Sequence, residues 1–305
     1  MRHANLAVLL TLALLNAGCI RKFAINKLGD ALAQSGSVFA SDDDPELIRA
    51  AAPFSLKLIE SLLAESPNHA GLLLAASRGF TQFGYAFVQQ HAEEIESDDF
   101  SESATQQARA RGLYLRARDY GLRGLETRHR GFRTGLEKDP RSVSTAVKAD
   151  VPLLYWTAAS WGAAIAVSKD RPDLISEQPM VEAMIDRALE LDESFESGAI
   201  HGFLIAYEPS RPSGQEDPFG RSRRHFERAV TLSGGQLASP FVSLAETVSQ
   251  KTQDRREFED LLNRALHIDV AAKPEWKLEN LIMQRRARWL LSRVDELFLQ
   301  DPQKE

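Results

Sequence analysis

Apolar residues recur at intervals of three and four along most of the chain beyond residue 44, which is the spacing of one face of an α-helix. Alternation with period two, the mark of a half-buried strand, is not sustained in any stretch. The residues from Glu46 to Glu65 show the helical spacing most clearly and are followed by Pro67. Asp44 and Pro45 supply a start signal, an N-cap side chain followed by proline at the first helical position. The pattern predicts an all-α chain.

Five of the expected helix ends share a further pattern. A large apolar or aromatic residue is followed three positions later by a small or apolar one, and a residue that ends the helix comes five positions after that. The five sets are Ile59, Leu62 and Pro67; Phe132, Gly135 and Pro140; Ile185, Ala188 and Glu193; Phe226, Ala229 and Gly234; and Leu262, Ala265 and Val270. This pattern is typical of the second helix of a tetratricopeptide hairpin, but only the last two sets approach its period of about 34 residues. We therefore expect stacked helical hairpins, a degenerate tetratricopeptide-like repeat with insertions.

The first eighteen residues have the organisation of an export signal. Arg2 is followed by an apolar core from Leu6 to Leu15, which is too short to span a bilayer, and then by the small residues that precede Cys19. This ending resembles the bacterial lipobox, although Asn16 stands where leucine is usual. The resemblance predicts a lipoprotein signal peptide over 1–18 and acylation of Cys19 as a lipid anchor. The alternative is an ordinary signal peptide that is cleaved nearby.

The remaining organisation follows from this signal. Residues 19–44 are expected to form a tether with a first short helix, and residues 45–300 a helical domain. Ile20 follows the cysteine where aspartate would commonly retain a lipoprotein at the inner membrane, so we expect the outer membrane. Two segments rich in turn formers or acidic residues, 93–103 and 208–220, are expected to be exposed loops.

The composition of the chain restricts the kinds of site and partner that are expected. Cys19 is the single cysteine, so neither a disulfide framework nor a thiolate metal site is expected. A formal net charge of −6 argues against nucleic acid as a partner. The chain lacks the nucleophile elbow, the phosphate-binding loop, the dinucleotide fingerprint and the HExxH zinc motif, so we expect neither an enzyme nor a bound cofactor.

The histidines do not form a motif. His91 lies near Glu93 and Glu94, but these carboxylates do not share its helical face, so no metal site is expected there. His201 and His225 fall inside helical segments, where a packed or half-exposed role is expected rather than a catalytic one.

Two groups of residues are candidates for binding. One is a stripe of arginines at seven-residue intervals, which share one helical face and could receive a ligand carboxylate or an acidic partner. The alternative for this stripe is a solvated face balanced by Asp119 and Glu126. The other group consists of aromatic side chains that could form the walls of an apolar pocket or pack in the core. The stripe is Arg109, Arg116, Arg123 and Arg130, and the aromatic candidates are Tyr155, Trp156, Trp161, Phe203 and Tyr207.

Several long segments together resemble the TatT family, the tetratricopeptide-like lipoproteins associated with TRAP transporters. They are LYLRARDYGLRGLE from 113, DVPLLYWTAASWGAAIAVSKD from 150, RALELDESFESGAIHGFLIAYE from 187, HFERAVTLSGGQLASPFVSLAE from 225 and NLIMQRRARWLLSRVDELF from 280. The resemblance implies a periplasmic accessory protein of solute uptake, with a TRAP solute-binding protein as partner and a small hydrophobic or organic-acid ligand. The competing hypothesis is an interaction scaffold for envelope proteins or peptides. The oligomeric state is left open.

Overall fold

The computed structural model describes residues 27, 29–31, 36–211 and 217–299, so Cys19 and the signal segment lie outside the described residues. Within the described ranges the chain forms helices and turns and no strand, which confirms the all-α prediction. The N-terminal elements are α2 (Gly36–Ala40), α3 (Pro45–Glu65), α4 (Ala70–Phe83), η1 (Gly84–Gln89), α5 (Gln90–Ile95), α6 (Phe100–Arg128), α7 (Phe132–Lys138), η2 (Pro140–Thr145), η3 (Lys148–Asp150), α8 (Val151–Ala166), α9 (Pro172–Ile175) and α10 (Gln178–Leu191). The C-terminal elements are η4 (Phe195–Ser197), α11 (Ala199–Tyr207), η5 (Glu208–Ser210), α12 (Pro218–Ser233), α13 (Ser239–Leu244), η6 (Ala245–Ser249), α14 (Arg255–Leu266), η7 (Pro274–Trp276), α15 (Lys277–Ser292) and α16 (Val294–Leu297).

The start of α3 is the one that the sequence predicts. The Asp44 carboxylate accepts hydrogen bonds from the backbone N–H groups of Glu46 and Leu47, both at 3.0 Å, and so satisfies two amides that have no partner within the helix. Pro45 occupies the first helical position, where its missing N–H costs nothing.

All five predicted helix ends are helix ends in the structure. Helices α3, α7, α10, α12 and α14 each stop after the small or apolar residue of the pattern and before the residue expected to end the helix. The small residues of the last three sets, Ala188, Ala229 and Ala265, are buried. The helices differ in length from 7 residues in α7 to 21 in α3. That they form a superhelical repeat stays a prediction.

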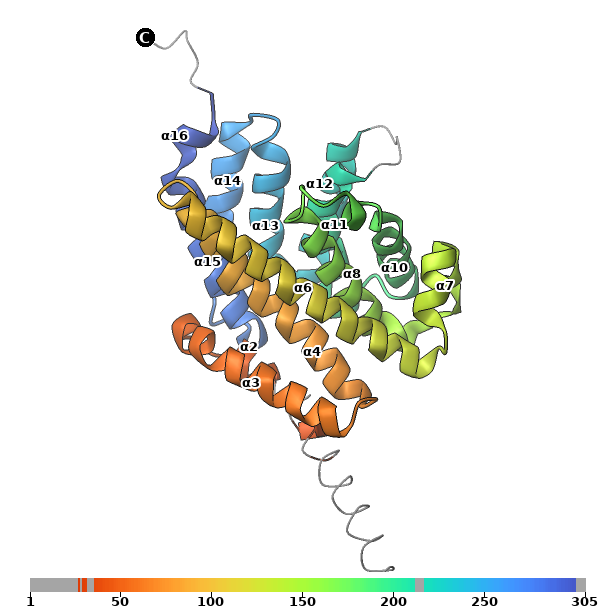
Figure 1. The fold of residues 1–305 in the computed structure, drawn as a ribbon. Coiled ribbons are helices and arrows are strands. Elements are labelled where there is room, and N and C mark those ends of the chain that lie inside the picture. Colours follow the sequence, from red (N-terminus) through yellow and green to blue (C-terminus); the bar gives the residue numbers. More distant parts are fainter. Residues whose placement is uncertain (1–26, 28, 32–35, 212–216, 300–305) are drawn as a thin grey trace, which may run out of the picture.

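Consecutive long helices pack on one another in two series (Figure 1). Helices α3, α4, α6, α8 and α10 follow one another in the first series, and α11 to α15 form the second. Glycines allow the closest approach in the first series, because a Cβ at Gly121 of α6 would lie 2.1 Å from the Thr157 hydroxyl of α8.

The apolar side chains of these helices form three cores. The first lies among α3, α4, η1 and α6, the second among α6, α7, α8, α10 and α11, and the third among α12, α13, η6, α14 and α15. Tyr114, Ile185 and Phe258 are fully buried members of the three cores in that order.

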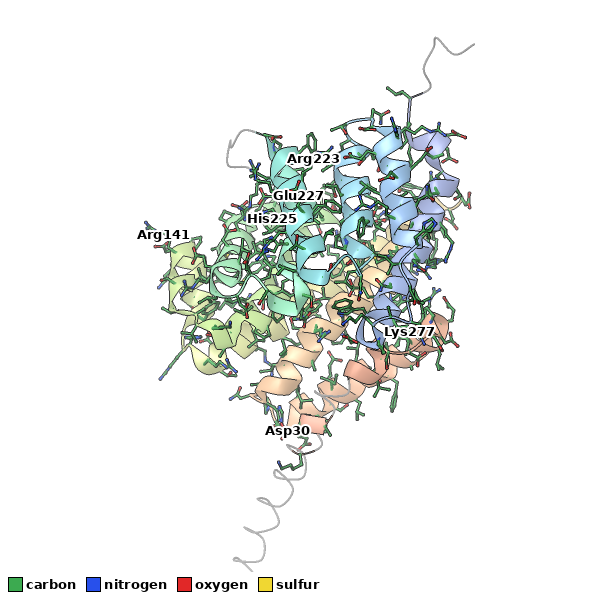
Figure 2. The ribbon with its side chains drawn as sticks, turned by 180° about the vertical axis from the view of Figure 1, so that it is seen from behind. Asp30, Arg141, Arg223, His225, Glu227 and Lys277 are labelled. Atoms are coloured by element: carbon green, nitrogen blue, oxygen red, sulfur yellow. The ribbon has the colours of Figure 1, made fainter. Side chains whose placement is uncertain are left out.

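The last long helix returns to the start of the chain. Helix α15 packs against α2 and α3, and the Lys277 ammonium lies 3.0 Å from the Asp43 carboxylate, at the place labelled in Figure 2. Arg285 adds longer-range pairs with Glu46 at 3.7 Å and Glu94 at 3.9 Å. The last helix of the second series therefore packs against the first helices of the chain.

The two loop predictions need correction. In the segment 93–103 only residues 96–99 lie outside a helix, because α5 extends to Ile95 and α6 begins at Phe100. In the segment 208–220, Glu208 is buried, since its carboxylate is held by Arg221 at 2.5 Å, and residues 212–216 lie outside the described residues.

Candidate functional site

A group of charged and aromatic side chains brings both helix series together. The guanidinium of Arg78 on α4 lies 3.3 Å from the Glu196 carboxylate of η4 and 5.4 Å from the centre of the Trp156 ring of α8. Tyr155 packs edge-on against Trp156 with 4.9 Å between ring centres. The group also contains Glu279 of α15, which interacts electrostatically with Arg78, and Ser239 of α13, which donates a hydrogen bond to Glu279 at 2.6 Å. We call these six residues the carboxylate–aromatic cluster.

Backbone geometry presents Glu196 to this cluster. Its φ of 41° and that of Ser197, 56°, lie in the left-handed region, which costs a residue other than glycine roughly 1–3 kcal/mol. Gly198 continues the turn with a φ of 98°, where a side chain would also meet Leu232. Strain of this kind often accompanies function, and here it fixes the direction of one carboxylate.

Both carboxylates are desolvated although they retain accessible surface. Burial raises the pKa of Glu196, Arg78 opposes the shift and Glu279 adds to it. Burial also raises the pKa of Glu279, while the Ser239 hydroxyl and Arg78 lower it. Yet the Glu196 side chain is 34% exposed and Glu279 is exposed.

A second polar group, the Arg286 network, lies along the same helices. Arg286 of α15 donates hydrogen bonds from Nε and Nη2 to one Glu246 oxygen of η6, at 3.0 and 2.6 Å, and its Nη2 lies 2.6 Å from Glu93 of α5. Its guanidinium also stacks on the Trp289 ring at 4.3 Å. Burial raises the pKa of Glu246, Arg286 opposes this shift and Glu93 adds to it.

Part of this network has no partner among the described residues. Arg286 is 7% exposed, and its Nη1 makes no hydrogen bond. Gln90 is fully buried, and neither of its amide atoms makes a hydrogen bond, although it lies close enough to Tyr85 to lower the pKa of that phenol slightly. Burial nevertheless raises the Tyr85 pKa, while 37% of the residue stays exposed. Unpaired buried polar groups are costly, and they mark places where a water molecule or a ligand can bind.

The two groups are related by helix geometry. Three helices each contribute one residue to the cluster and another, seven positions later, to the Arg286 network, a separation of two turns or about 10 Å. Two of these pairs reach into π-helical segments, η1 and η6, a rare conformation that is frequent at functional sites. The three pairs are Arg78 and Tyr85, Ser239 and Glu246, and Glu279 and Arg286.

Four of the five aromatic candidates, Tyr155, Trp161, Phe203 and Tyr207, lie in or against the second core, and Trp156 does not. Tyr155 and Trp156 belong to the carboxylate–aromatic cluster, and Trp156 is 7% exposed without belonging to any of the three apolar cores. Trp161 is a member of the second core, and its indole N–H donates to Glu177 at 2.7 Å. Phe203 and Tyr207 stack at 5.1 Å and also pack in that core.

The arginine stripe connects helices and is shorter than predicted. Helix α6 ends at Arg128, so Arg130 does not share its face, which corrects the prediction of four aligned arginines. Arg116 lies 3.5 Å from Glu60 of α3, and Arg123 donates to the Pro67 carbonyl at 2.9 Å. Arg109 donates to Gln106 on its own helix. Two of the four arginines thus tie α6 to α3 and the turn that follows it, through partners other than Asp119 and Glu126.

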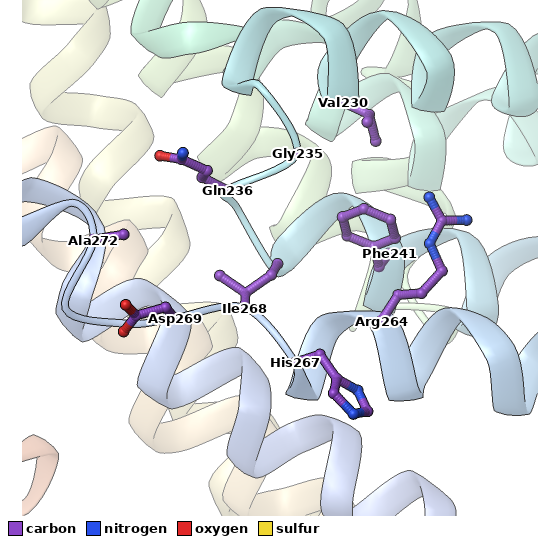
Figure 3. Close-up of a pocket in the computed structure, with 9 residues that line it drawn as sticks. All are labelled: Val230, Gly235, Gln236, Phe241, Arg264, His267, Ile268, Asp269 and Ala272. Atoms are coloured by element: carbon purple, nitrogen blue, oxygen red, sulfur yellow. The ribbon is translucent and has the colours of Figure 1, made fainter.

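An open groove lies on the surface of the second series (Figure 3). It has a volume of about 480 Å³ and lies between the end of α12, the start of α13 and the end of α14. The Arg264 guanidinium lies 4.7 Å from the centre of the Phe241 ring, while Val230 and Ile268 add apolar surface. A second hollow, of about 440 Å³, is lined by α6 residues that include Arg116 and Arg123.

The histidines are placed as expected for packed groups. His201 of α11 and His225 of α12 contact each other through Nδ1 atoms 2.8 Å apart (Figure 2 labels His225 on α12). Across the described part of the chain, no three His, Cys, Asp or Glu side chains are grouped to hold a metal ion.

Sequence reasoning missed the charged members of both polar groups. Arg78, Glu196, Glu279 and Arg286 come from three separate elements, α4, η4 and α15, and the sequence pattern singles out none of them as a site residue. One weak signal was available, because Arg285 and Arg286 interrupt an otherwise apolar helix face after Ile282 and Met283.

The fold and these polar groups define an all-helical protein in which two helix series meet around clustered charges. No helix within the described ranges is long and apolar enough to cross a membrane. The family described as TRAP transporter T-component matches residues 41–298, and the chain therefore belongs to this family, TatT. An uncharacterized protein of Treponema pallidum (strain Nichols) is 30% identical over 309 residues, which cover 94% of this chain and 95% of that protein. The family consists of accessory transporter components rather than enzymes and implies a location in the cell envelope.

Proposed function

We propose that this protein is the periplasmic, lipid-anchored component of a TRAP uptake system and that it binds a small, largely apolar ligand at the carboxylate–aromatic cluster. The observation that carries the proposal is the placement of Trp156. This ring lies outside the three apolar cores, beside Tyr155, and faces the accessible Arg78–Glu196 pair. An aromatic wall with a few polar groups suits a ligand with an apolar body and one polar end.

The proposed partner is the TRAP solute-binding protein. Family membership supports this choice, because an accessory component of an uptake system has to exchange ligand, or make contact, with the protein that carries the solute. The hydrophobic ligand expected from the sequence fits Trp156 and Tyr155. An organic acid fits the cluster less well, since it would approach two carboxylates.

The test is native mass spectrometry of the protein purified from its host. The expected result is a retained small molecule in the parent protein that is lost in Trp156→Ala. It should be kept in Trp289→Ala, which removes a ring of the same size from the Arg286 network. Retention of the same molecule by Trp156→Ala would contradict the site, and absence of any ligand together with a bound solute-binding protein would support docking alone.

The groove of Figure 3 favours a second candidate, an interaction scaffold for envelope proteins or peptides. Arg264 is exposed there, stacked over the buried Phe241 ring, and could hold an acidic or aromatic side chain of a partner. Surface plasmon resonance with the purified solute-binding protein, beside native mass spectrometry, separates the two functions. Binding by a parent protein that retains no ligand, lost in Arg264→Ala, would favour the scaffold.

A further inference from the structure

The charges around the proposed ligand site are unbalanced. Glu196 pairs with the guanidinium of Arg78, and Glu279 interacts electrostatically with the same guanidinium, so the cluster carries one excess negative charge when both carboxylates are ionised. Arg78 is also the cation common to the electrostatic surroundings of Tyr155, Glu196 and Glu279. Arg78 is already paired with Glu196 and stacked on Trp156, so it offers an incoming anion little unopposed charge.

The Arg286 network also carries an excess negative charge when its carboxylates are ionised. Glu93 and Glu246 share one arginine, and two turns of helix separate this network from the cluster. An anion that moved along these helices would therefore meet excess negative charge at both levels.

We infer that the ligand of the carboxylate–aromatic cluster is an organic cation, an alkyl- or arylammonium whose charged end pairs with Glu196 and Glu279 and whose apolar body lies against Tyr155 and Trp156. Phe195, whose ring centre is 5.3 Å from that of Tyr155, extends the apolar wall. Aromatic rings attract cations as well as apolar groups, so one surface serves both ends of such a ligand. This inference rests on the proposed ligand site and assigns its charge.

The desolvated carboxylates agree with this assignment. Burial raises the pKa of Glu196 and of Glu279, so each ionised carboxylate lacks part of the stabilisation that water would give. An ammonium supplies that stabilisation, whereas a ligand carboxylate would add a third charge of the same sign.

The experiment compares three probes of equal length by isothermal titration calorimetry at neutral pH: n-octylamine, n-octanol and octanoate. We expect n-octylamine to bind at least about tenfold more tightly than octanoate, with n-octanol between them. Glu279→Gln should weaken n-octylamine binding by about tenfold or more while leaving n-octanol unchanged. The matched control is Glu227→Gln, an exposed carboxylate on α12 that should leave all three affinities unchanged (Figure 2).

The possible outcomes test the charge of the ligand separately from the existence of the ligand site. If octanoate binds more tightly than n-octylamine, the ligand is not a cation, but the ligand site stands. The same holds if the three probes bind equally and all lose affinity in Trp156→Ala. Binding of n-octylamine that is unaffected by both Glu279→Gln and Trp156→Ala would overturn the cation at this site. Failure of all three probes would overturn the inference, while native mass spectrometry would still test the proposed function.

Discussion

The Nδ1 atoms of His201 and His225 lie 2.8 Å apart, between α11 and α12. Only one of two imidazole nitrogens this close can donate a proton to the other, so the contact requires at least one neutral ring. His201 also lies 3.5 Å from Glu193, and His225 lies 3.8 Å from Glu208. The pair joins two helices through a contact that depends on protonation.

The histidine pair predicts loss of stability in acid. Burial, His201 and nearby arginines hold the pKa of His225 at about 4, from 6.5, and Glu208 opposes this shift. Burial also lowers the pKa of His201, while Glu193 opposes it. The unfolded chain therefore binds protons first as pH falls, and stability declines from about pH 6.5 toward pH 4, by at most about 3 kcal/mol for His225.

Urea unfolding across this pH range measures how the free energy of unfolding depends on pH. The charged groups around the two rings are Glu193, Glu208, Arg211, Arg224 and Arg228. His225→Asn should flatten the decline, whereas His267→Asn, directly after α14, should not. Equal slopes in the parent and in His225→Asn would count against the pair as the cause.

Two tryptophan variants should differ in stability. Trp161→Ala removes a 4% exposed ring from the second core and leaves Glu177 and Arg118 without their indole contact, so it should cost roughly 3–5 kcal/mol. Trp156→Ala should cost less than half as much, because the ring lies outside the three apolar cores. Thermal melts of both proteins decide this, and equal losses would identify Trp156 as a core residue.

Removing the cation of the Arg286 network should destabilise the fold. Arg286→Met leaves Glu93 and Glu246 close together without a counter-charge, which should cost about 3 kcal/mol. The control is Arg255→Met, since Arg255 is 48% exposed in its pairs with Glu259 and Asp295 and should contribute little to stability. Chemical denaturation compares the two, and similar small losses would mean that the network contributes little.

The lipid anchor can be tested by cell fractionation. Cys19→Ser should release the protein from membranes into the soluble periplasmic fraction, because it removes the thiol that acylation requires. Fractions of parent and variant are compared by immunoblot and mass spectrometry of the N-terminus. A parent protein that is soluble and unacylated would contradict the anchor.

The helices could be predicted because their signals are local. Asp44 and Pro45 start α3 through contacts within one turn, and the five helix ends follow from residues eight positions apart at most. The extent of α6 was overestimated at Arg130, since the turn there depends on the left-handed Gly131, whose φ is 80°. The prediction that Glu208 is exposed was wrong, because its ion-pair partner Arg221 lies on the next helix.

The site could be predicted only in part, because it depends on side chains that are distant in sequence. Tyr155 and Trp156 are neighbours in sequence and were found as candidates. Their charged partners, Arg78, Glu196 and Glu279, are brought near by packing of separate helices, and no spacing rule connects them. The left-handed turn at Glu196 has no sequence signal either, since glutamate is not a residue typical of this conformation.

Photo-crosslinking in the host cell tests the central claim most directly. Tyr155→p-benzoylphenylalanine places a photoreactive group in the carboxylate–aromatic cluster. Phe54→p-benzoylphenylalanine places it on the outer face of α3, where Phe54 is 73% exposed. After irradiation, intact mass spectrometry should show a small-molecule adduct at position 155 and none at position 54. An unmodified mass at position 155, or the same small-molecule adduct at position 54, would contradict a ligand-binding component with its site at this cluster.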